Sequence, residues 1–293
     1  MDQRPAKHFI NVMNAGSLLI ISNAIDSFVN PYLYCMNTII KEVRGSLAIL
    51  RLNRPEKFNS FNREMALQLQ EYLDEIEKDK TIRCIMITGS GKAFCAGQDL
   101  GEVSGENPIA FSKILGEHYN PIITRIRNME LPVLAAVNGV AAGAGANIAL
   151  CCDVVLASSS ASFIQAFSKI GLIPDSGGTF FLPRLIGFQK ASAIAMLGDK
   201  ISAEEAERMG MIYKVLEDAN FLAAAEEIAT KLAEMPTYGL SLTKKALNSS
   251  MKNSLEEQLH LEDEYQMKAG ASNDYREGVN AFIEKRTPVF KGN

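Results

Sequence analysis

Hydrophobic and polar positions along the chain follow two different periods, and together these predict an α/β fold. Alternation and short apolar runs predict strands at 37–42, 46–52, 82–88, 133–137 and 153–157. Apolar residues at helical spacing predict helices over 63–78 and 108–129. From residue 189 onward the pattern is helical, apart from a short strand near 211–216. We therefore expect an α/β half followed by a helical half.

The first 35 residues do not fit this pattern. They contain one short apolar run, GSLLII, with no small-residue cleavage site after it, which is untypical of a signal peptide. Strand alternation begins only after Met36. Residues 1–35 are therefore interpreted as an extension outside the fold, either an upstream start or the remnant of a tag.

The longest apolar stretch, residues 131–161, has the length of a membrane span but not its composition. Asn138, Asn147 and Asp153 interrupt it, glycines cluster in it, and no basic loops flank it. A strand, a glycine-rich turn, a helix that begins near Gly143 and a second strand account for it better. We expect no membrane association.

Composition and charge narrow the class of protein. The chain has 293 residues, of which 47% are hydrophobic, so it can bury a large core. Its net charge of −4 argues against a nucleic-acid partner. The five cysteines lack the spacing of a metal site and are expected to be reduced, buried side chains of a cytoplasmic protein.

Several short motifs fail when each is compared with its full pattern. TGSGKAF has Met86 and Ala93 where a phosphate-binding loop needs Gly and Ser or Thr. GAGAN lacks the third glycine of a dinucleotide-binding turn. His8, His118 and His260 are scattered, so no metal site is predicted, and His118 is expected at a surface or half-buried helical position.

Two glycine-rich loops follow predicted strands and suggest a site made of backbone. GKAFCAGQDL follows IRCIMITGS, and NGVAAGAGAN follows LPVLAAV. If the loops face each other, their N–H groups could hold an oxygen that becomes negative during a reaction, which is an oxyanion hole. Two ordinary glycine turns remain the alternative.

One carboxylate lies in an otherwise apolar segment, GLIPDSGGTFFLPRLIG. Asp175 stands between Pro174 and Ser176, and a pair of glycines follows. An Asp in such a turn often only hydrogen-bonds its own backbone. The alternative is a buried carboxylate with a raised pKa that exchanges protons with a substrate.

Three segments, AFCAGQDL, PVLAAVNGVAAGAGANIALCCDVVLAS and GLIPDSGGTFFLPRLIG, resemble in this order the crotonase (enoyl-CoA hydratase/isomerase) superfamily. The resemblance runs from about Met36 to the C-terminus and includes the ending NDYREGVNAFIEKRTPVFKG. It implies an α/β fold with a crotonase-like spiral of ββα units over 36–230 and a helical trimerisation part over 231–293. It further implies a homotrimer or a dimer of trimers, a coenzyme A thioester as substrate, and no metal or separate cofactor.

The resemblance assigns roles to individual residues. The N–H groups of Gln98 and Ala144 match the oxyanion donors, with Gly143 as the alternative to Ala144. The coenzyme A contacts are expected at Lys57, Ala96, Asp99, Leu100, Phe282 and Lys285, the last two from a neighbouring subunit.

Two departures from the hydratase pattern indicate which reaction is expected. Asn147 and Phe167 stand in the substrate pocket where hydratases of the family have glutamates, so addition of water is not expected. The isomerase branch of the family places Asp175 beside the acyl chain as the acid/base. An apolar pocket around it is expected from Phe167, Ile173, Phe180 and Phe181.

The resemblance therefore implies an isomerase that converts a ring epoxide of phenylacetyl-CoA to an oxepin. A Δ3,Δ2-enoyl-CoA isomerase of fatty-acid oxidation is the enzymatic alternative, since it would use the same Asp175. A non-catalytic acyl-CoA or RNA-binding protein on the same fold is the alternative from another class.

Overall fold

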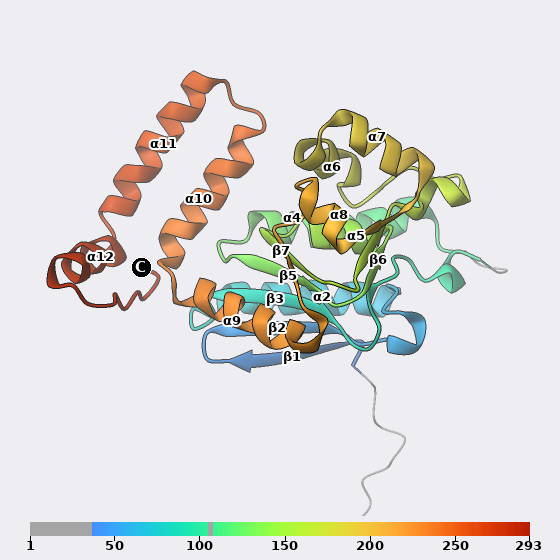
Figure 1. Ribbon diagram of the computed structural model, residues 1–293, viewed down its shortest axis with the longest axis horizontal. Coiled ribbons are helices and arrows are strands. Elements are labelled where there is room, and N and C mark those ends of the chain that lie inside the picture. Colours follow the sequence, from blue (N-terminus) through green and yellow to red (C-terminus); the bar gives the residue numbers. More distant parts are fainter. Residues whose placement is uncertain (1–36, 105–107) are drawn as a thin grey trace, which may run out of the picture. The chain divides into compact units, whose positions relative to one another are not determined.

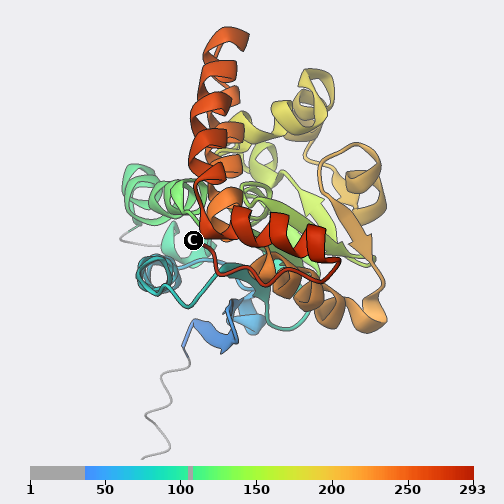
Figure 2. The same cartoon turned by 90° about the vertical axis from the view of Figure 1, so that its left-hand side faces the viewer.

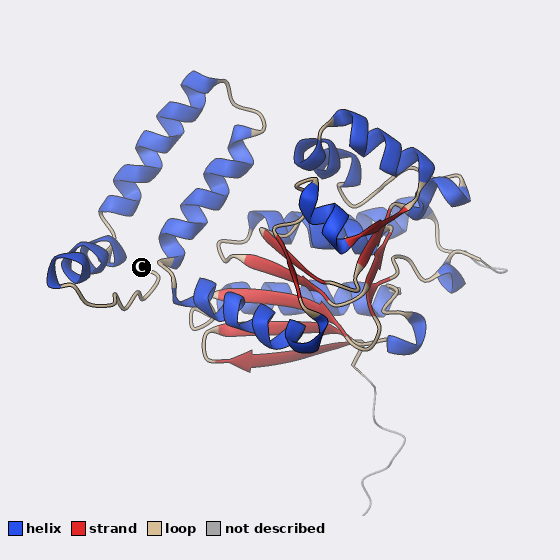
Figure 3. Cartoon of the chain, in the orientation of Figure 1, coloured by secondary structure: helices blue, strands red, loops and turns tan. Residues whose placement is uncertain are grey.

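A six-stranded sheet forms the base of the fold (Figures 1 and 3). The computed structural model describes residues 37–104 and 108–293, so the predicted extension at 1–35 lies outside the described residues. β1 is antiparallel to β2 and the other neighbours are parallel. In spatial order the strands are β1 (Ile39–Arg44), β2 (Leu47–Leu52), β3 (Cys84–Gly89), β5 (Val133–Val137), β7 (Val154–Ser158) and β10 (Lys214–Leu216).

A second sheet of four short strands was not predicted. Its strands, in spatial order, are β4 (Ala93–Cys95), β6 (Val140–Ala142), β8 (Ser162–Ile164) and β9 (Lys200–Ser202). β4, β6 and β8 each follow directly on a strand of the first sheet, which is the repeated ββ unit of a spiral. Three residues are too few to show alternation, so the sequence pattern could not reveal these strands.

Helices cover both sheets and form the C-terminal part. The helix predicted over 63–78 matches α2 at both ends, and Asn62 caps it by accepting the Met65 N–H at 3.0 Å. The described helices of the α type are α2 (Arg63–Lys78), α3 (Phe111–Lys113), α4 (Asn120–Asn128), α5 (Ala144–Leu150), α6 (Gly178–Ile186), α7 (Phe188–Leu197), α8 (Ala203–Arg208), α9 (Phe221–Glu234), α10 (Thr237–Ser250), α11 (Leu255–Gly270) and α12 (Asn273–Glu284).

The helix expected over 108–129 is not one regular helix. It consists of α3, a π-helix over Ile114–Tyr119, and α4. Pro121 has no N–H, so it cannot donate to the carbonyl of Glu117 four residues earlier. Gln70 Nε2 of α2 donates to that carbonyl instead, at 2.8 Å. The wider π-turn is therefore stabilised from outside the helix.

The strands of the first sheet are buried on both faces. On β2, Leu47 and Ile49 pack with Phe221 and other residues of α9, whereas Leu50 and Leu52 face the main core. Two-sided burial explains why these strands are apolar runs rather than alternating segments. The boundary expected after residue 230 falls inside α9, which is continuous from Phe221 to Glu234.

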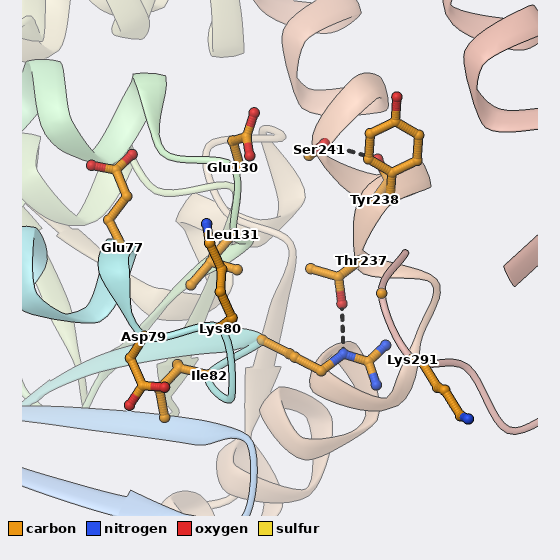
Figure 4. A pocket seen from close by; sticks show the side chains of 12 residues that line it. Glu77, Asp79, Lys80, Ile82, Glu130, Leu131, Thr237, Tyr238, Ser241 and Lys291 are labelled. Atoms are coloured by element: carbon orange, nitrogen blue, oxygen red, sulfur yellow. Dashed lines mark hydrogen bonds between the residues drawn. The ribbon is translucent and has the colours of Figure 1, made fainter. Parts of the chain in front are cut away.

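The C-terminal segment returns to the sheet and is fixed there by Arg83. Its guanidinium donates to the Phe290 carbonyl at 2.7 Å and to Thr237 Oγ1 at 2.9 Å, the second of which is drawn beside Thr237 in Figure 4. Asp274 of α12 accepts the N–H groups of Lys291 and Gly292 at 2.7 and 2.8 Å. These bonds hold the tail beside α12, as Figure 2 shows.

A buried lysine attaches α10 to the α/β half. Lys244 Nζ donates to the carbonyls of Ile126 at 2.7 Å and Leu131 at 3.1 Å, and lies 2.8 Å from Asp153 Oδ2. Asp153 also pairs with Arg127 at 3.0 Å. All three ammonium protons therefore have acceptors, which is the condition for burying such a charge.

We predict that Lys244→Met lowers the free energy of unfolding by about 3 kcal/mol, because it leaves Asp153 and two carbonyls short of a buried partner. Lys245→Met is the matched control, since Lys245 pairs with Glu130 at the surface and such a pair contributes about 1 kcal/mol or less. Urea denaturation of both variants measures the difference. Equal losses in the two variants would contradict the role given to Lys244.

Candidate active site

A cavity of about 410 Å³ brings most of the predicted site residues together. Its wall is built from the ends of β4 and β6, the π-helix, and the segment that follows β8. Eight of the twelve predicted residues line it: Lys57, Ala96, Gln98, Leu100, Gly143, Ala144, Phe167 and Asp175.

The two glycine-rich loops do face each other, and they meet at very short distances. Gly97 has φ +91°, and a Cβ on it would lie 2.9 Å from the Ala142 carbonyl oxygen and 3.5 Å from the Ala144 nitrogen. A Cβ on Gly145 would lie 2.4 Å from the Cys95 carbonyl oxygen. Only glycine fits at these two positions, so the loop sequences are explained by backbone contact.

The backbone N–H groups of Gln98 and Ala144 are available as a pair. The Gly143 N–H donates to the Ile164 carbonyl at 2.9 Å, whereas Ala144 is the first residue of α5 and has no intrahelical acceptor. The Phe61 N–H donates to the Gly97 carbonyl at 2.7 Å, and the Phe61 carbonyl accepts the Asp99 N–H at 2.8 Å, so Phe61 makes no bond to the Gln98 N–H between them. Within residues 37–104 and 108–293, neither the Gln98 nor the Ala144 N–H donates a hydrogen bond. Of the two alternatives for the second donor, Ala144 is the available one.

Asp175 supplies the one carboxylate of the cavity wall in the described part of the chain. Its carbonyl accepts the Gly178 N–H at 2.8 Å, and the next residue, Ser176, has a left-handed φ of 50°. Burial raises the pKa of the Asp175 carboxyl, and a hydrogen bond from Ser176 Oγ at 2.9 Å lowers it in part. The backbone of Asp175 therefore forms the predicted turn, and the residue also lines the cavity, while its role in proton exchange stays a prediction.

Asn147 does not line the cavity, which corrects its assignment to substrate binding. Its side chain is fully buried and its Nδ2 donates to the Asp175 carbonyl at 2.8 Å. Its Oδ1 accepts from Gln165 Nε2 at 2.8 Å. A Cβ on Gly178 would lie 2.4 Å from Asn147 Nδ2, so this glycine leaves room for the amide. Asn147 therefore supports the Asp175 loop through a hydrogen bond and does not itself line the cavity.

The prediction of which apolar residues surround Asp175 was only partly right. Phe167 lines the cavity, but Ile173 is 78% exposed, and Phe180 and Phe181 pack on each other with ring centroids 5.2 Å apart. The π-helix and the segment before it contribute apolar side chains in their place. These are Leu100, Val103, Phe111, Ile114 and Leu115.

Three predicted coenzyme A residues lie outside the cavity wall. Asp99 pairs with Arg54 at 2.8 Å and accepts the Gly101 N–H at 3.0 Å. Burial alone would raise its pKa, but these two partners lower it below the usual value. Phe282 is 86% exposed on α12, and Lys285 follows the same helix. Within one chain, the structure does not bring Phe282 and Lys285 to the cavity.

His118 and Tyr119, at the end of the π-helix, were not predicted to be buried. His118 was expected at a surface or half-buried position and is instead fully buried, where desolvation lowers its pKa. Tyr119 lines the cavity, and its Oη donates to Gln98 Oε1 at 2.9 Å. A regular helix was assumed over this segment, so its inward face was misassigned.

The described chain has other cavities, and one of about 750 Å³ beside α10, α11 and α12 is lined in part by Phe282. No helix of the described residues has the length and apolar composition to cross a bilayer. The same residues hold no cluster of three or more His, Cys, Asp or Glu side chains arranged to bind a metal. The smaller pocket in Figure 4, of about 120 Å³, lies near Thr237 and Lys291 and contains none of the predicted site residues.

The chain is similar to known proteins over most of its length. The chain is 49% identical over 261 residues to the 1,2-epoxyphenylacetyl-CoA isomerase of Escherichia coli K12, covering 88% of this chain and 99% of that protein. It is 36% identical to the short-chain-enoyl-CoA hydratase of Clostridium acetobutylicum, over 86% of this chain and 96% of that protein. The crystal structure of an enoyl-CoA hydratase from Bacillus anthracis superposes with a TM-score of 0.82 at 33% identity, covering 87% of this chain and 100% of that one.

The family and the fold follow from these findings. The family model described as enoyl-CoA hydratase/isomerase matches residues 42–293, almost the whole of the described chain. The predicted α/β spiral is confirmed by the solved structures it resembles. The chain belongs to the enoyl-CoA hydratase/isomerase, or crotonase, family.

Proposed function

We propose that this protein is an isomerase of coenzyme A thioesters that converts 1,2-epoxyphenylacetyl-CoA to its oxepin. The observation that carries the proposal is the wall of one cavity, where the carboxylate of Asp175 occurs together with the free N–H groups of Gln98 and Ala144. The 49% sequence identity between this chain and the E. coli isomerase supports the choice of substrate.

The thioester carbonyl is activated by the two backbone donors. When a proton leaves the carbon next to this carbonyl, the electron pair moves onto the carbonyl oxygen. The N–H groups of Gln98 and Ala144 donate to that oxygen and stabilise the enolate without any side-chain rearrangement. Close loop contact at Gly97 keeps the donors near each other.

Asp175 carries the proton. The carbon–carbon bond of the epoxide first opens to the seven-membered ring by electron reorganisation within the ring, which leaves a double bond at the ring carbon that bears the side chain. The Asp175 carboxylate then takes the proton from the carbon next to the carbonyl and returns it to a ring carbon two bonds away, while this double bond shifts toward the side chain. Proton and electrons stay within the substrate and Asp175, so we propose no cofactor besides the coenzyme A of the substrate. The raised pKa of Asp175 suits a group that both accepts and donates.

The same cavity is poorly suited to hydration. Phe167 places an aromatic ring on the wall, and Asn147 has its amide engaged on both sides by Asp175 and Gln165. Neither residue can activate a water molecule as a carboxylate would.

Coenzyme A binding is proposed along the Ala96–Leu100 loop and Lys57, with Phe282 and Lys285 contributed by a neighbouring subunit. Ala96, Leu100 and Lys57 line the cavity. Phe282 and Lys285 lie on α12, where they are free to reach another subunit.

A Δ3,Δ2-enoyl-CoA isomerase would use the same groups, because a proton also moves between carbons of the acyl chain there. Incubating the purified protein with ring-epoxide and 3-enoyl thioesters, and following products by mass spectrometry, separates the two. Faster turnover of the straight-chain thioester would favour the alternative.

The first functional prediction concerns Asp175. Asp175→Asn should lower isomerase turnover by about 10²-fold or more, because an amide cannot accept the proton. The Asp175 carbonyl keeps its bonds from Gly178 and Asn147, so melting temperature and thioester affinity should stay close to those of the parent. In the parent, activity should fall as pH drops through the raised pKa, since only the carboxylate is a base.

Asp199→Asn, at an exposed position, is the control for this substitution. Near-normal turnover in Asp175→Asn, on a thioester that the parent isomerises, would overturn the mechanism.

The second prediction concerns water addition. Crotonyl-CoA should be hydrated no faster than the uncatalysed background, because the described cavity wall has no second carboxylate beside Asp175. Chromatography of the reaction mixture measures 3-hydroxybutyryl-CoA. Its rapid formation by the purified protein would contradict the proposal.

The third prediction concerns assembly. Sedimentation should show a trimer or a dimer of trimers, and Phe282→Ala should weaken binding of the coenzyme A thioester by about 10-fold or more, the effect of losing a buried phenyl group. Val43→Ala, at an exposed position on β1, is the matched control. A monomer with unchanged affinity in Phe282→Ala would rule out the proposed shared site.

A further inference from the structure

Tyr119 is a buried phenol on the cavity wall for which the mechanism above has no use. It is 1% exposed and stands at the last position of the π-helix. Its ring lies 5.9 Å from that of Phe61, and its Oη donates to Gln98 Oε1 at 2.9 Å. The phenol therefore contacts the side chain of a residue whose backbone supplies a proposed oxyanion donor.

The direction of this hydrogen bond is fixed by a second contact of Gln98. Gln98 Nε2 donates to Glu102 Oε2 at 2.9 Å, and Glu102 Oε1 accepts the Arg63 N–H at 2.8 Å. An ionised carboxylate only accepts, so Glu102 requires the nitrogen of the amide. The amide oxygen is then left for Tyr119, which must be the donor.

The phenol proton is thus committed to Gln98 and is not available to the substrate. Burial also raises the pKa of Tyr119 well above its usual value, so the phenol stays neutral and is not a base. Within the described cavity wall, proton transfer remains with Asp175.

The backbone on either side of Gln98 is held by Phe61, whose N–H donates to the Gly97 carbonyl at 2.7 Å and whose carbonyl accepts the Asp99 N–H at 2.8 Å. Gly97, directly before Gln98, has φ +91° and no side chain that could pack to hold the loop. The two hydrogen bonds to the Gln98 side chain are a second constraint on this residue. A donor acts on a developing charge only if its direction is set beforehand.

We propose that Tyr119 is a positioning residue: together with Glu102 it clamps the Gln98 side chain and thereby adds to the Phe61 bonds in restricting the direction of the Gln98 N–H toward the thioester oxygen. The inference rests on the proposed function in that Gln98 is taken as an oxyanion donor. Tyr119 ends the π-helix, in which the Glu117 carbonyl accepts from Gln70 Nε2 at 2.8 Å.

Tyr119→Phe tests the proposal, because it keeps the ring beside Phe61 and removes only the hydroxyl. Turnover should fall by about 10-fold, less than the roughly 10²–10³-fold lost when an oxyanion donor is removed outright. KM should stay within about twofold, since the loss appears mainly in the transition state. Tyr72→Phe, which removes a partly buried phenol of α2, is the matched control.

A spectroscopic probe reports on the donors without requiring turnover. The absorbance of bound 2,4-hexadienoyl-CoA shifts to the red when its carbonyl is polarised. The shift should be smaller in Tyr119→Phe and in Gln98→Met, and Tyr119→Phe should add nothing in the Gln98→Met background. Asp175→Asn should keep the full shift.

These outcomes separate the two proposals. A parent protein that shifts the probe but isomerises no thioester would remove the proposed function and leave the positioning role intact, provided that Tyr119→Phe reduces the shift. An undiminished shift with unchanged turnover in Tyr119→Phe overturns the role of Tyr119. A loss of thioester affinity at unchanged turnover in Tyr119→Phe would also overturn this role, because Tyr119 would then only contact the acyl group.

Discussion

The close approach of backbone at the ends of β4 and β6 is the constraint on which the site depends. A Cβ on Gly97 would lie 2.9 Å from the Ala142 carbonyl oxygen, and one on Gly145 would lie 2.4 Å from that of Cys95. No side chain can separate the strands there, so their main chains meet directly. The pair of free N–H groups at Gln98 and Ala144 results from this contact and needs no functional side chain.

The carboxylate depends on a different kind of support. Asp175 stands in a turn where Ser176 has a left-handed backbone, and the turn is held by the buried amide of Asn147. The Asp175 carbonyl only accepts, so it fixes which end of that amide faces it, and Gln165 Nε2 donates to the other end. Because a buried amide is costly unless bonded, this chain of contacts determines one arrangement of the loop. Backbone contact therefore places the proposed donors, and a polar network places the proposed base.

The sequence predicted the elements whose signal is long and the residues whose role is carried by a motif. α2 matched at both ends because sixteen residues repeat the helical period and Asn62 caps them. The strands of the second sheet are three residues long and have no period to detect. Asn147 was misassigned because sequence position cannot show whether a side chain faces a cavity or stands behind it. His118 and Tyr119 were missed for a further reason, since their orientation depends on a π-turn that also accepts a hydrogen bond from another helix.

That π-turn has a consequence for how the cavity can be altered. A π-turn holds one residue more than an α-turn, so shortening the Ile114–Tyr119 segment by one residue would let a continuous α-helix form between the same two ends. The change would rotate this part of the cavity wall while leaving the Gln98 and Ala144 N–H groups and the Asp175 loop in place. Length variation at this one point gives a protein engineer a way to reshape the cavity independently of those groups.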